Sequence, residues 1–313
     1  MPNVGIGADG VVGIAIETTG GEYEGPTKFF PIRSEGLQWT QETTFRRVIR
    51  NTVDPIGAVP GNGHAEGDIE MEALEDVLPY FLQASRGELT QSGTAPDFTY
   101  EFVPNGDATP TETLSITVVR NDQVFGYTGC VVASFSFSVD DGMLTYTPSI
   151  LGQEEDSEVS PTATFSDDGP FGAGTYDVQI PTGTTVEDTD DMTFEVNDNG
   201  EVQNRLLQRR GAAFVSYGDR EATLSVERDF EDRTEYEEFK DLTAKEITIR
   251  AEKDTDRFIE IHMNSAIVNE YEVSLGGTGD LIRASVSYMG TDTASGDGSY
   301  KITIGTDEDL ALA

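Results

Sequence analysis

The feature that most constrains the fold of this chain is a strand, turn and strand pattern that occurs twice. It spans residues 130–152 and returns, much altered, over residues 267–290. In both segments apolar residues alternate with serine, threonine or glutamate on either side of a turn rich in glycine and aspartate. Alternation with a period of two around such a turn predicts antiparallel strands with one buried face. A hairpin that recurs about 138 residues later indicates a duplicated unit.

Each hairpin is preceded by a strand that is acidic on one face and by a short helix. Residues 67–73 and 219–229 alternate acidic or small polar residues with apolar ones, and residues 74–82 and 234–242 carry apolar residues at helical spacing. Pro79 must shorten or kink the first helix. The acidic positions of the two strands that matter most below are Asp68, Glu70, Glu72, Glu221 and Glu227.

Two long segments without regular alternation, residues 42–66 and 197–216, contain the main clusters of basic residues. Connections of this length are uncommon in compact domains unless they bind something. In so acidic a chain we expect these arginines to pair with carboxylates on neighbouring chains. They are Arg46, Arg47, Arg50, Arg205, Arg209 and Arg210.

The order of predicted elements is the same in both parts of the chain, which suggests two domains. Residues 153–169 are acidic and rich in serine, threonine and turn residues, so they are the best candidate for a linker. We therefore predict a first domain over residues 1–152, an acidic linker over residues 153–169 and a second domain over residues 170–313.

Charge is the extreme property of the composition. The chain has 58 Asp and Glu against 20 Lys and Arg, giving a net charge of -38. In dilute salt such a chain repels both itself and nucleic acid, but at molar salt the Debye length falls to about 3 Å and the repulsion is screened. Regular alternation through most of the sequence argues against disorder. The composition therefore favours a folded protein adapted to high salt.

Motifs for catalysis and for cofactor or metal binding are missing or stand in the wrong context. Gly5, Gly7 and Gly10 spell G-x-G-x-x-G, but the following residues 11–16 predict a strand where a dinucleotide site needs a helix. Cys130 is the only cysteine, so no intrachain disulfide can form, and apolar neighbours predict a buried thiol. We predict no catalytic residue, no metal site and no cofactor. We also expect no secretion signal and no membrane span.

Several stretches together resemble one family, the tail tube proteins of long-tailed, siphovirus-like viruses of bacteria and archaea. The resemblance is a pattern of strands, loop and helix with weak identity, and it touches most of the chain. The stretches are residues 34–50, 63–83, 127–152, 192–203, 217–239 and 272–290.

The resemblance implies a mainly β fold, with two diverged copies of a tail-tube-type β-sandwich or partial barrel, each flanked by one short α-helix. Family members form rings with a continuous inner β-barrel, and the rings stack into a tube that conducts viral DNA. A duplicated chain is then expected to form a homotrimeric ring with pseudo-six-fold symmetry. Its partners would be other copies, the tape measure, terminator and baseplate proteins at the tube ends, and DNA that passes without specific binding. The expected location is the virion tail, assembled in the cytoplasm of a halophilic host.

Three alternatives stay open at this point. If the second part is a different β-domain, the ring is a hexamer. The acidity serves salt adaptation, or it lines the lumen with Asp68, Glu70, Glu72, Glu221 and Glu227 and repels DNA; both predict acid on exposed strand faces. The third alternative is a secreted or surface β-domain that binds a ligand in a halophile.

Overall fold

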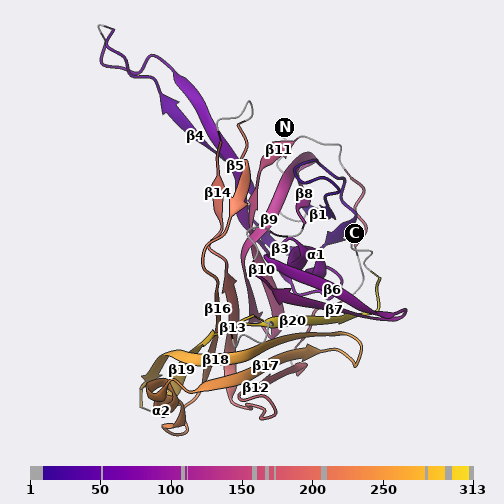
Figure 1. Cartoon of the computed structure of the whole chain (residues 1–313), viewed down its shortest axis with the longest axis vertical. Helices are drawn as coiled ribbons and strands as arrows, with labels where there is room; N and C mark the ends of the chain where they lie inside the picture. The colour runs from indigo at the N-terminus through magenta and orange to yellow at the C-terminus, as the bar shows by residue number, and fades with distance from the viewer. Residues whose placement is uncertain are drawn as a thin grey trace.

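The computed structural model describes residues 10–50, 52–106, 110, 112–156, 161–165, 169–172, 174–205, 210–278, 281–292 and 298–309. Within them the chain is mainly β with two short helices, which confirms the predicted fold class. Residues 10–156 are called the first half below, and residues 161–309 the second half. Most of the first half forms the upper part of Figure 1, and most of the second half forms the lower part.

In its described residues the first half contains eleven strands and one helix. They are β1 (Val11–Ile16), β2 (Lys28–Phe30), β3 (Ile32–Glu35), β4 (Gln38–Phe45), β5 (Ala58–Glu72), α1 (Leu78–Gln83), β6 (Gly87–Thr94), β7 (Asp97–Pro104), β8 (Leu114–Arg120), β9 (Gln123–Asp140), β10 (Met143–Gly152) and β11 (Glu154–Asp156).

The second half contains nine strands and one helix within the described residues. They are β12 (Tyr176–Gln179), β13 (Thr189–Asn197), β14 (Glu201–Gln203), β15 (Phe214–Ser216), β16 (Glu221–Asp229), α2 (Thr234–Asp241), β17 (Ala244–Glu252), β18 (Phe258–Ser274), β19 (Arg283–Gly290) and β20 (Lys301–Thr306).

A continuous antiparallel sheet, called the central sheet below, runs through both halves. Its strand order is β5, β10, β9, β13, β16, β19 and β18, and β3 and β4 add to the outer edge of β5. The halves meet where β9 of the first pairs with β13 of the second. A second contact lies where β7 pairs with β20. Within the described residues, named strands of the two halves are therefore paired at two places.

One face of the central sheet is buried because its strands alternate as the sequence predicts. Phe135 and Phe137 of β9, Tyr146 of β10 and Phe194 of β13 are all almost fully buried. Phe137 and Tyr146 pack with ring centroids 4.8 Å apart, and Phe194 contacts Tyr300 at 5.6 Å. Phe135 of the first half also contacts Tyr300 of the second, with ring centroids 6.3 Å apart, so the aromatic core crosses the boundary between the halves.

The two halves use the same scheme of strand pairing. In the first half β1 pairs with β8, β8 with β9, β9 with β10, and β10 with β5. In the second half β12 pairs with β17, β17 with β18, β18 with β19, and β19 with β16. The short strands β11 and β20 each pair with the first part of the long strand, β9 or β18. The β6–β7 hairpin is an addition to the first half.

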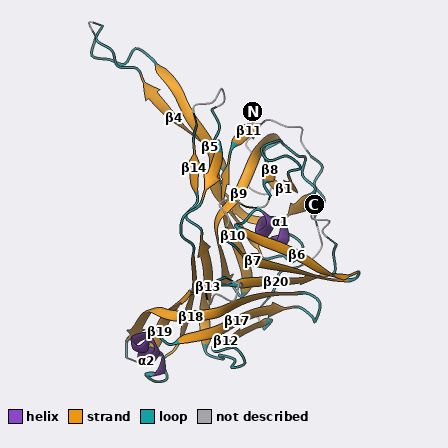
Figure 2. Cartoon of the chain, viewed as in Figure 1, coloured by secondary structure: helices purple, strands orange, loops and turns teal. Residues whose placement is uncertain are grey.

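Both predicted helices are present, and they differ in how far their residues are buried. Pro79 is the second residue of α1, in the first turn, where its missing N–H costs nothing, and the helix begins at Leu78, later than the predicted start at Leu74. Residues 78–82 of α1 are buried. α2 keeps the predicted Thr234 start, but none of its residues is buried. Figure 2 shows α1 inside the first half and α2 at the far end of the second.

Two sequence predictions of irregular structure were wrong. Residues 42–66 were expected to lack strands, yet β4 and β5 continue through them as a paired hairpin, with Phe45 opposite Ala58. Residues 197–216 contain the paired strands β14 and β15. In the outer part of the first hairpin both faces are exposed, so no alternation reveals it. The predicted linker begins with strand β11, while Gly5 and Gly7 lie outside the described residues.

Cys130 is fully buried, as predicted, and burial raises its pKa well above the ordinary value. A thiol held in its neutral form is a poor nucleophile. Cys130 is therefore a structural residue of the first half.

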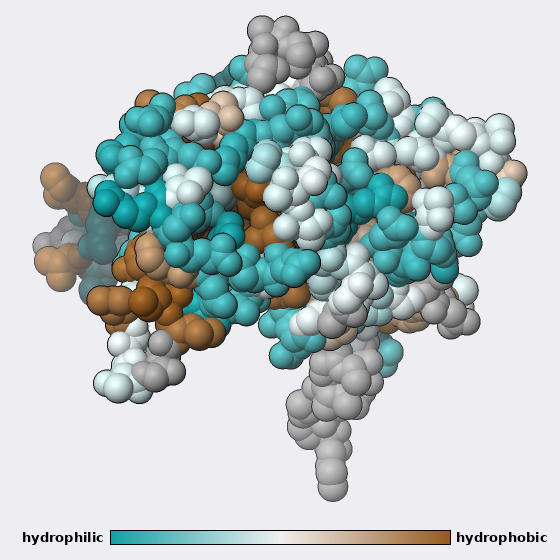
Figure 3. All heavy atoms as spheres, turned by 90° about the horizontal axis from the view of Figure 1, so that it is seen from below, coloured by the Kyte–Doolittle hydropathy of each residue, from teal (hydrophilic) through white to brown (hydrophobic). Residues whose placement is uncertain are grey.

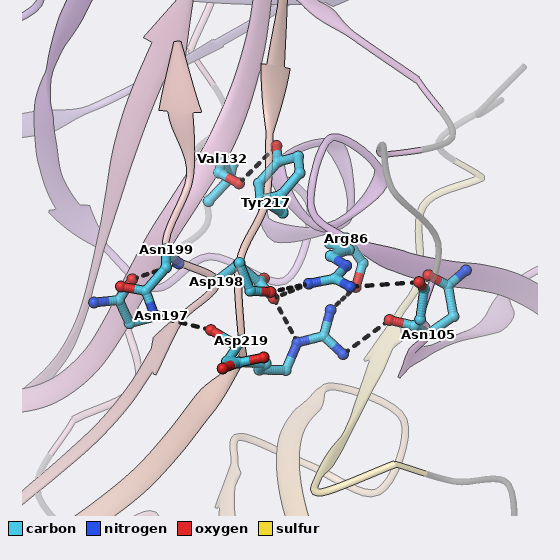
Figure 4. Close-up of polar contacts among 11 residues, drawn as sticks. Arg86, Asn105, Val132, Asn197, Asp198, Asn199, Tyr217 and Asp219 are labelled. Atoms are coloured by element: carbon cyan, nitrogen blue, oxygen red, sulfur yellow. Dashed lines mark hydrogen bonds and ion pairs between the residues drawn. The ribbon is translucent and has the colours of Figure 1, made fainter. Parts of the chain in front are cut away.

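Buried ion pairs join the halves beside the β9–β13 contact. Asp198, which follows β13, accepts a hydrogen bond of 2.6 Å from Nε of Arg220 and lies 3.8 Å from Arg86 of the first half (Figure 4). Arg220 also donates to the backbone oxygens of Arg86 and Asn105. Burial raises the pKa of Asp198, while Arg220 and Arg86 act to lower it. A second buried pair joins Glu75 to Lys253 at 2.7 Å.

We predict that Arg220→Ala destabilises the fold by about 3–5 kcal/mol at neutral pH, because it leaves the buried Asp198 carboxylate without its main partner. Arg220 lowers the pKa of Asp198, so its loss matters most where the carboxyl group is charged. The destabilisation should therefore shrink as the pH falls and Asp198 takes up a proton. Chemical denaturation at several pH values measures it. Arg257→Ala, which breaks a more exposed pair with Asp254, serves as the control and should stay within about 1 kcal/mol of wild type.

Candidate functional site: the polar sheet face and the hairpin arm

The face of the central sheet opposite the aromatic core, called the polar face below, carries only short polar or acidic side chains over most of its width. One row of directly opposed residues crosses all seven strands: Glu72, Thr145, Ser138, Thr193, Ser225, Ser287 and Glu270. The rows on either side of it are mainly of the same kind, with Met143 and Met289 as apolar members. The residues that alternate with the core therefore form one continuous surface.

All five residues predicted to line a lumen lie on the polar face. Asp68, Glu70 and Glu72 come from β5, while Glu221 and Glu227 come from β16. β10, β9 and β13 separate the two groups. The structure thus brings the two acidic strands into one surface without direct contact between them. Asp68, Glu221 and Glu227 are exposed, and Glu70 and Glu72 are partly exposed.

Sequence reasoning missed further acidic residues on this face. Glu195 of β13 lies opposite Ser136, and Glu270 and Glu272 of β18 lie opposite Ser287 and Ser285. Their alternation with apolar neighbours was visible in the sequence. What it could not show was that β13 pairs with β9 and so brings all seven strands into one sheet.

Basic residues are nearly missing from the polar face. Among its described positions in the seven strands the one lysine or arginine is Arg283, the first residue of β19, which pairs with Asp190 and Asp229. Arg33, beside the β9–β10 turn, binds Asp140 at 2.5 Å and lies 3.9 Å from Glu70. The face therefore presents uncompensated negative charge among serine and threonine hydroxyls. Such a surface repels polyanions.

The second candidate surface is the hairpin arm, defined as residues 41–63, which leaves the body of the molecule at the upper left of Figure 1. Arg46 continues the hairpin beyond β4 and β5 through backbone bonds with Gly57 and Ile56. The arm carries exposed apolar side chains at and near its tip. Their exposed fractions are 60% for Phe45, 47% for Val48, 107% for Ile49, 93% for Val53 and 47% for Val59.

The arginines of the two loops differ from the other arginines described. Nine others each form an ion pair with a carboxylate of this chain: Arg33, Arg86, Arg120, Arg220, Arg228, Arg233, Arg250, Arg257 and Arg283. Arg46, Arg47 and Arg50 on the arm are exposed and have no ion pair within the described residues. Unpaired arginines in so acidic a chain point to an external partner.

The second predicted arginine cluster lies at the base of the arm and not at its tip. The backbone oxygen of Arg210 accepts a hydrogen bond of 3.0 Å from Gly63, and its side chain lies 3.5 Å from Gln41. Arg205 stacks over Phe214 at 5.1 Å from the ring centre. Arg209 lies outside the described residues. β14 and β15 thus form a shorter hairpin beside the arm.

A third exposed surface is the end of the second half. The exposed side chains lie where β18 and α2 end and β19 begins, and their exposed fractions run from 36% to 79%: Val273, Leu275, Leu281, Ile282 and Leu242. In the view from below, hydrophobic side chains gather at the left, the side on which α2 lies (Figure 3). A surface of this kind is typical of protein contacts.

These surfaces suit binding and assembly. Among the described residues no group of three or more His, Cys, Asp or Glu side chains is placed to hold a metal ion. No helix within the described ranges combines the length and the apolar character needed to cross a membrane.

Comparison with known proteins agrees with a role in assembly. A search of curated proteins finds no match. A family model described as phage tail tube protein matches residues 7–290, which is nearly the whole chain. The chain therefore belongs to the phage tail tube protein family.

Proposed function

We propose that this protein is the duplicated tail tube subunit of a siphovirus-like virus of a halophilic host, and that three copies close into each ring of the tube. Membership of the family makes the chain a non-enzymatic structural subunit of the virion tail. The proposal of a duplicated subunit in a trimeric ring rests on the β9–β13 contact, which joins two similar halves edge to edge within one chain.

Coincident irregularities in strand register support a duplication with domains over residues 1–152 and 170–313. Three shifts in the first half have counterparts in the equivalent strand pairs of the second. The shifts lie between Ser149/Ile150 and Val268/Glu270, between Leu114/Ile116 and Lys245/Ile247, and between Ile32/Ser34 and Thr189/Asp191. Register shifts behave as inherited features of a fold. Two unrelated β-domains, the basis of a hexameric ring, have no reason to share them.

The two halves can be aligned on these register shifts. Each strand edge that is paired in the β9–β13 contact then has an equivalent edge in the other half that is unpaired within the chain. Residues 134–138 of β9 correspond to residues 270–274 of β18, and residues 193–197 of β13 correspond to residues 36–40. Phe137 and Phe194 are fully buried at the joined edges, whereas Val273, at the position of Phe137, is 36% exposed. The first edge is covered by the second half of the same chain. The second edge awaits the first half of another chain.

Ring closure follows from this equivalence. Residues 270–274 of one copy pair with residues 36–40 of the next, as β9 pairs with β13, and the contact is repeated until the ring closes. The first half contributes β3 with β4 as one strand position, the acidic strand β5 and the β9–β10 hairpin to the inner sheet. The second half contributes β13, the acidic strand β16 and the β18–β19 hairpin. Three chains then make a barrel of roughly 24 strands, which is more than the 16–18 strands that already leave an aqueous channel.

The polar face suits the wall of this channel. With the aromatic core on the outer side of the sheet, the side chains that face inward are serine, threonine, aspartate and glutamate. Carboxylates repel DNA phosphates, and short hydroxyl side chains offer no bidentate contact to phosphate or base. DNA can then pass without specific binding. Salt adaptation is compatible with a role as channel wall, because molar salt screens the repulsion between the carboxylates of the wall.

The arm suits contacts between rings. It extends beyond the sheet, carries unpaired arginines and exposes apolar side chains, as a segment that contacts another chain does. Tape measure, terminator and baseplate proteins are the expected partners where the stack of rings ends. Assembly is expected in the host cytoplasm, before the tail joins the virion.

We predict that Glu272→Cys combined with Gln38→Cys forms a disulfide between chains in assembled rings, since the proposed register places these residues directly opposite each other. After oxidation, denaturing gels without reductant should show two-chain and three-chain species and nothing larger. Six-chain species would show that the ring is a hexamer.

Two further pairs control the register. Ser136→Cys with Glu195→Cys occupies the equivalent opposed positions inside one chain, so it should form a disulfide within the monomer. Glu272→Cys with Ser34→Cys is displaced by four residues and should remain reduced. Equal cross-linking of both interchain pairs would contradict the proposed register.

We predict that Glu221→Lys with Glu227→Lys makes assembled tubes retain duplex DNA at low salt, because both lysines face the channel. Retention should weaken with salt, with log K falling by about 0.9 per log unit of salt for each phosphate contact. Filter binding with assembled tubes measures it. Glu231→Lys with Asp256→Lys makes the same charge change away from the polar face and should retain little DNA. Equal retention by both variants would refute the channel wall.

We predict that replacing residues 46–57 by Asn-Gly leaves rings that do not stack. Phe45 and Ala58 lie directly opposite each other, and an Asn-Gly turn closes such a hairpin without strain. Negative-stain microscopy in molar salt should show single rings where wild type shows tubes. Tubes of normal length would exclude the arm from stacking.

A further inference from the structure

The second half contains a cleft whose chemistry complements the arm. It has a volume of about 400 Å³ and lies between β12 and β13. Val139, Val178 and Met192 contribute apolar surface, and Glu187, Asp190 and Asp191 contribute carboxylates. We call it the carboxylate cleft.

Two of these carboxylates have no basic partner within the described residues. Asp190 pairs with Arg283. Glu187 and Asp191 are exposed and form no ion pair in that part of the chain; Asp191 only accepts a hydrogen bond of 2.7 Å from the backbone N–H of Met192. The cleft therefore joins an apolar floor to unpaired negative charge.

The carboxylate cleft and the arm lie at opposite ends of the central sheet. The arm leaves the sheet near Ala65, which lies opposite Gly152 of β10. Val139 and Met192, in the cleft, lie near the other end of β9 and β13, beside the β9–β10 turn. One copy can therefore offer its arm to the cleft of another only in a head-to-tail arrangement.

The first half has an equivalent cleft, but its charges are already satisfied. This cleft, of about 510 Å³, lies between β1 and β3 and includes Ile32, Arg33 and Arg120. Arg33 pairs with Asp140, and Arg120 binds Glu35 through two hydrogen bonds of 2.6 and 2.7 Å. Of the two clefts, only that of the second half offers unpaired carboxylates. Of these two clefts in the described part of the chain, the carboxylate cleft is therefore the one that matches the unpaired arginines of the arm.

We propose that the arm of each subunit docks in the carboxylate cleft of a subunit in the next ring. Ile49 and its apolar neighbours cover the floor of the cleft, and the arm arginines pair with Glu187 and Asp191. This inference rests on the proposed function, because it names the partner surface of the stacking arm. A head-to-tail contact of this kind never closes, so it extends a tube without limit. At molar salt the ion pairs weaken, while the apolar part of the contact persists.

A disulfide between rings tests the proposal. Ile49→Cys with Val186→Cys, which lies in the carboxylate cleft, should link each chain to one in the ring above and one in the ring below. Oxidised tubes should then give a ladder that extends well beyond three chains on gels without reductant. Ile49→Cys with Ile32→Cys places the second cysteine in the equivalent cleft of the first half and should give no ladder. A ladder from the Ile32 pair alone would overturn the assignment of the cleft.

A charge exchange tests the same contact without cysteine. Glu187→Arg with Asp191→Arg should shorten tubes at least tenfold at moderate salt while rings still form. Adding Arg47→Glu and Arg50→Glu to that variant should restore tube length. Intact rings with unrestored length would overturn the docking and leave the proposed function standing. Wild-type protein that forms neither rings nor tubes would overturn both.

Discussion

The pairing of β9 with β13 is the interaction on which the rest of the structure depends. Backbone groups at a sheet edge must be paired or exposed to water, and an unpaired edge invites another strand. Within the chain, this pairing satisfies one edge of each half, and beside it Phe135 and Tyr300 join the two aromatic cores into one. It also brings the acidic strands β5 and β16 into a single surface. Without it the polar face would be two narrow strips, and the exposed end of β18 would have no buried counterpart to explain it.

The β9–β13 contact within the chain has additional contacts beside it that the proposed contact between chains would lack. β7 pairs with β20 outside the central sheet, and the buried Asp198, Arg220 and Arg86 cluster lies between this contact and the β9–β13 pairing. The β6–β7 hairpin has no equivalent in the second half, where only residues 242 and 243 separate α2 from β17. A trimeric ring would therefore alternate strong and weaker junctions. The single chain then acts as a preformed third of the ring, and only the weaker junctions need to form during assembly.

Sequence patterns predicted the parts of the fold in which one face is buried. The alternation around Phe137 and Val273, the helix at Thr234 and the acidic faces of β5 and β16 were all legible because burial imposes a period on the side chains. The strands of the arm could not be predicted, because both of its faces are exposed to solvent and its apolar residues therefore do not alternate with polar ones. The pairing of β9 with β13 could not be predicted either. It joins strands more than fifty residues apart, and Ser136 opposite Glu195 leaves no signature in either segment. The five acidic residues predicted to line a lumen lie on one face of the sheet, whereas Glu195, Glu270 and Glu272 could be added to that face only from the three-dimensional pairing.

The distribution of charge links salt adaptation to assembly. Most described arginines are used inside the chain, so the net charge of -38 is concentrated where carboxylates remain unpaired. The polar face is the largest such surface and the carboxylate cleft a smaller one. In the proposed trimer, closing a ring would turn three polar faces toward one axis, which would raise the repulsion among their carboxylates at low salt. Screening by salt lowers that cost, since the Debye length falls below the separation of most of these groups. On this proposal, high salt would favour the ring and the tube without neutralising the carboxylates, and a channel wall that still carries them would give DNA phosphates nothing to bind.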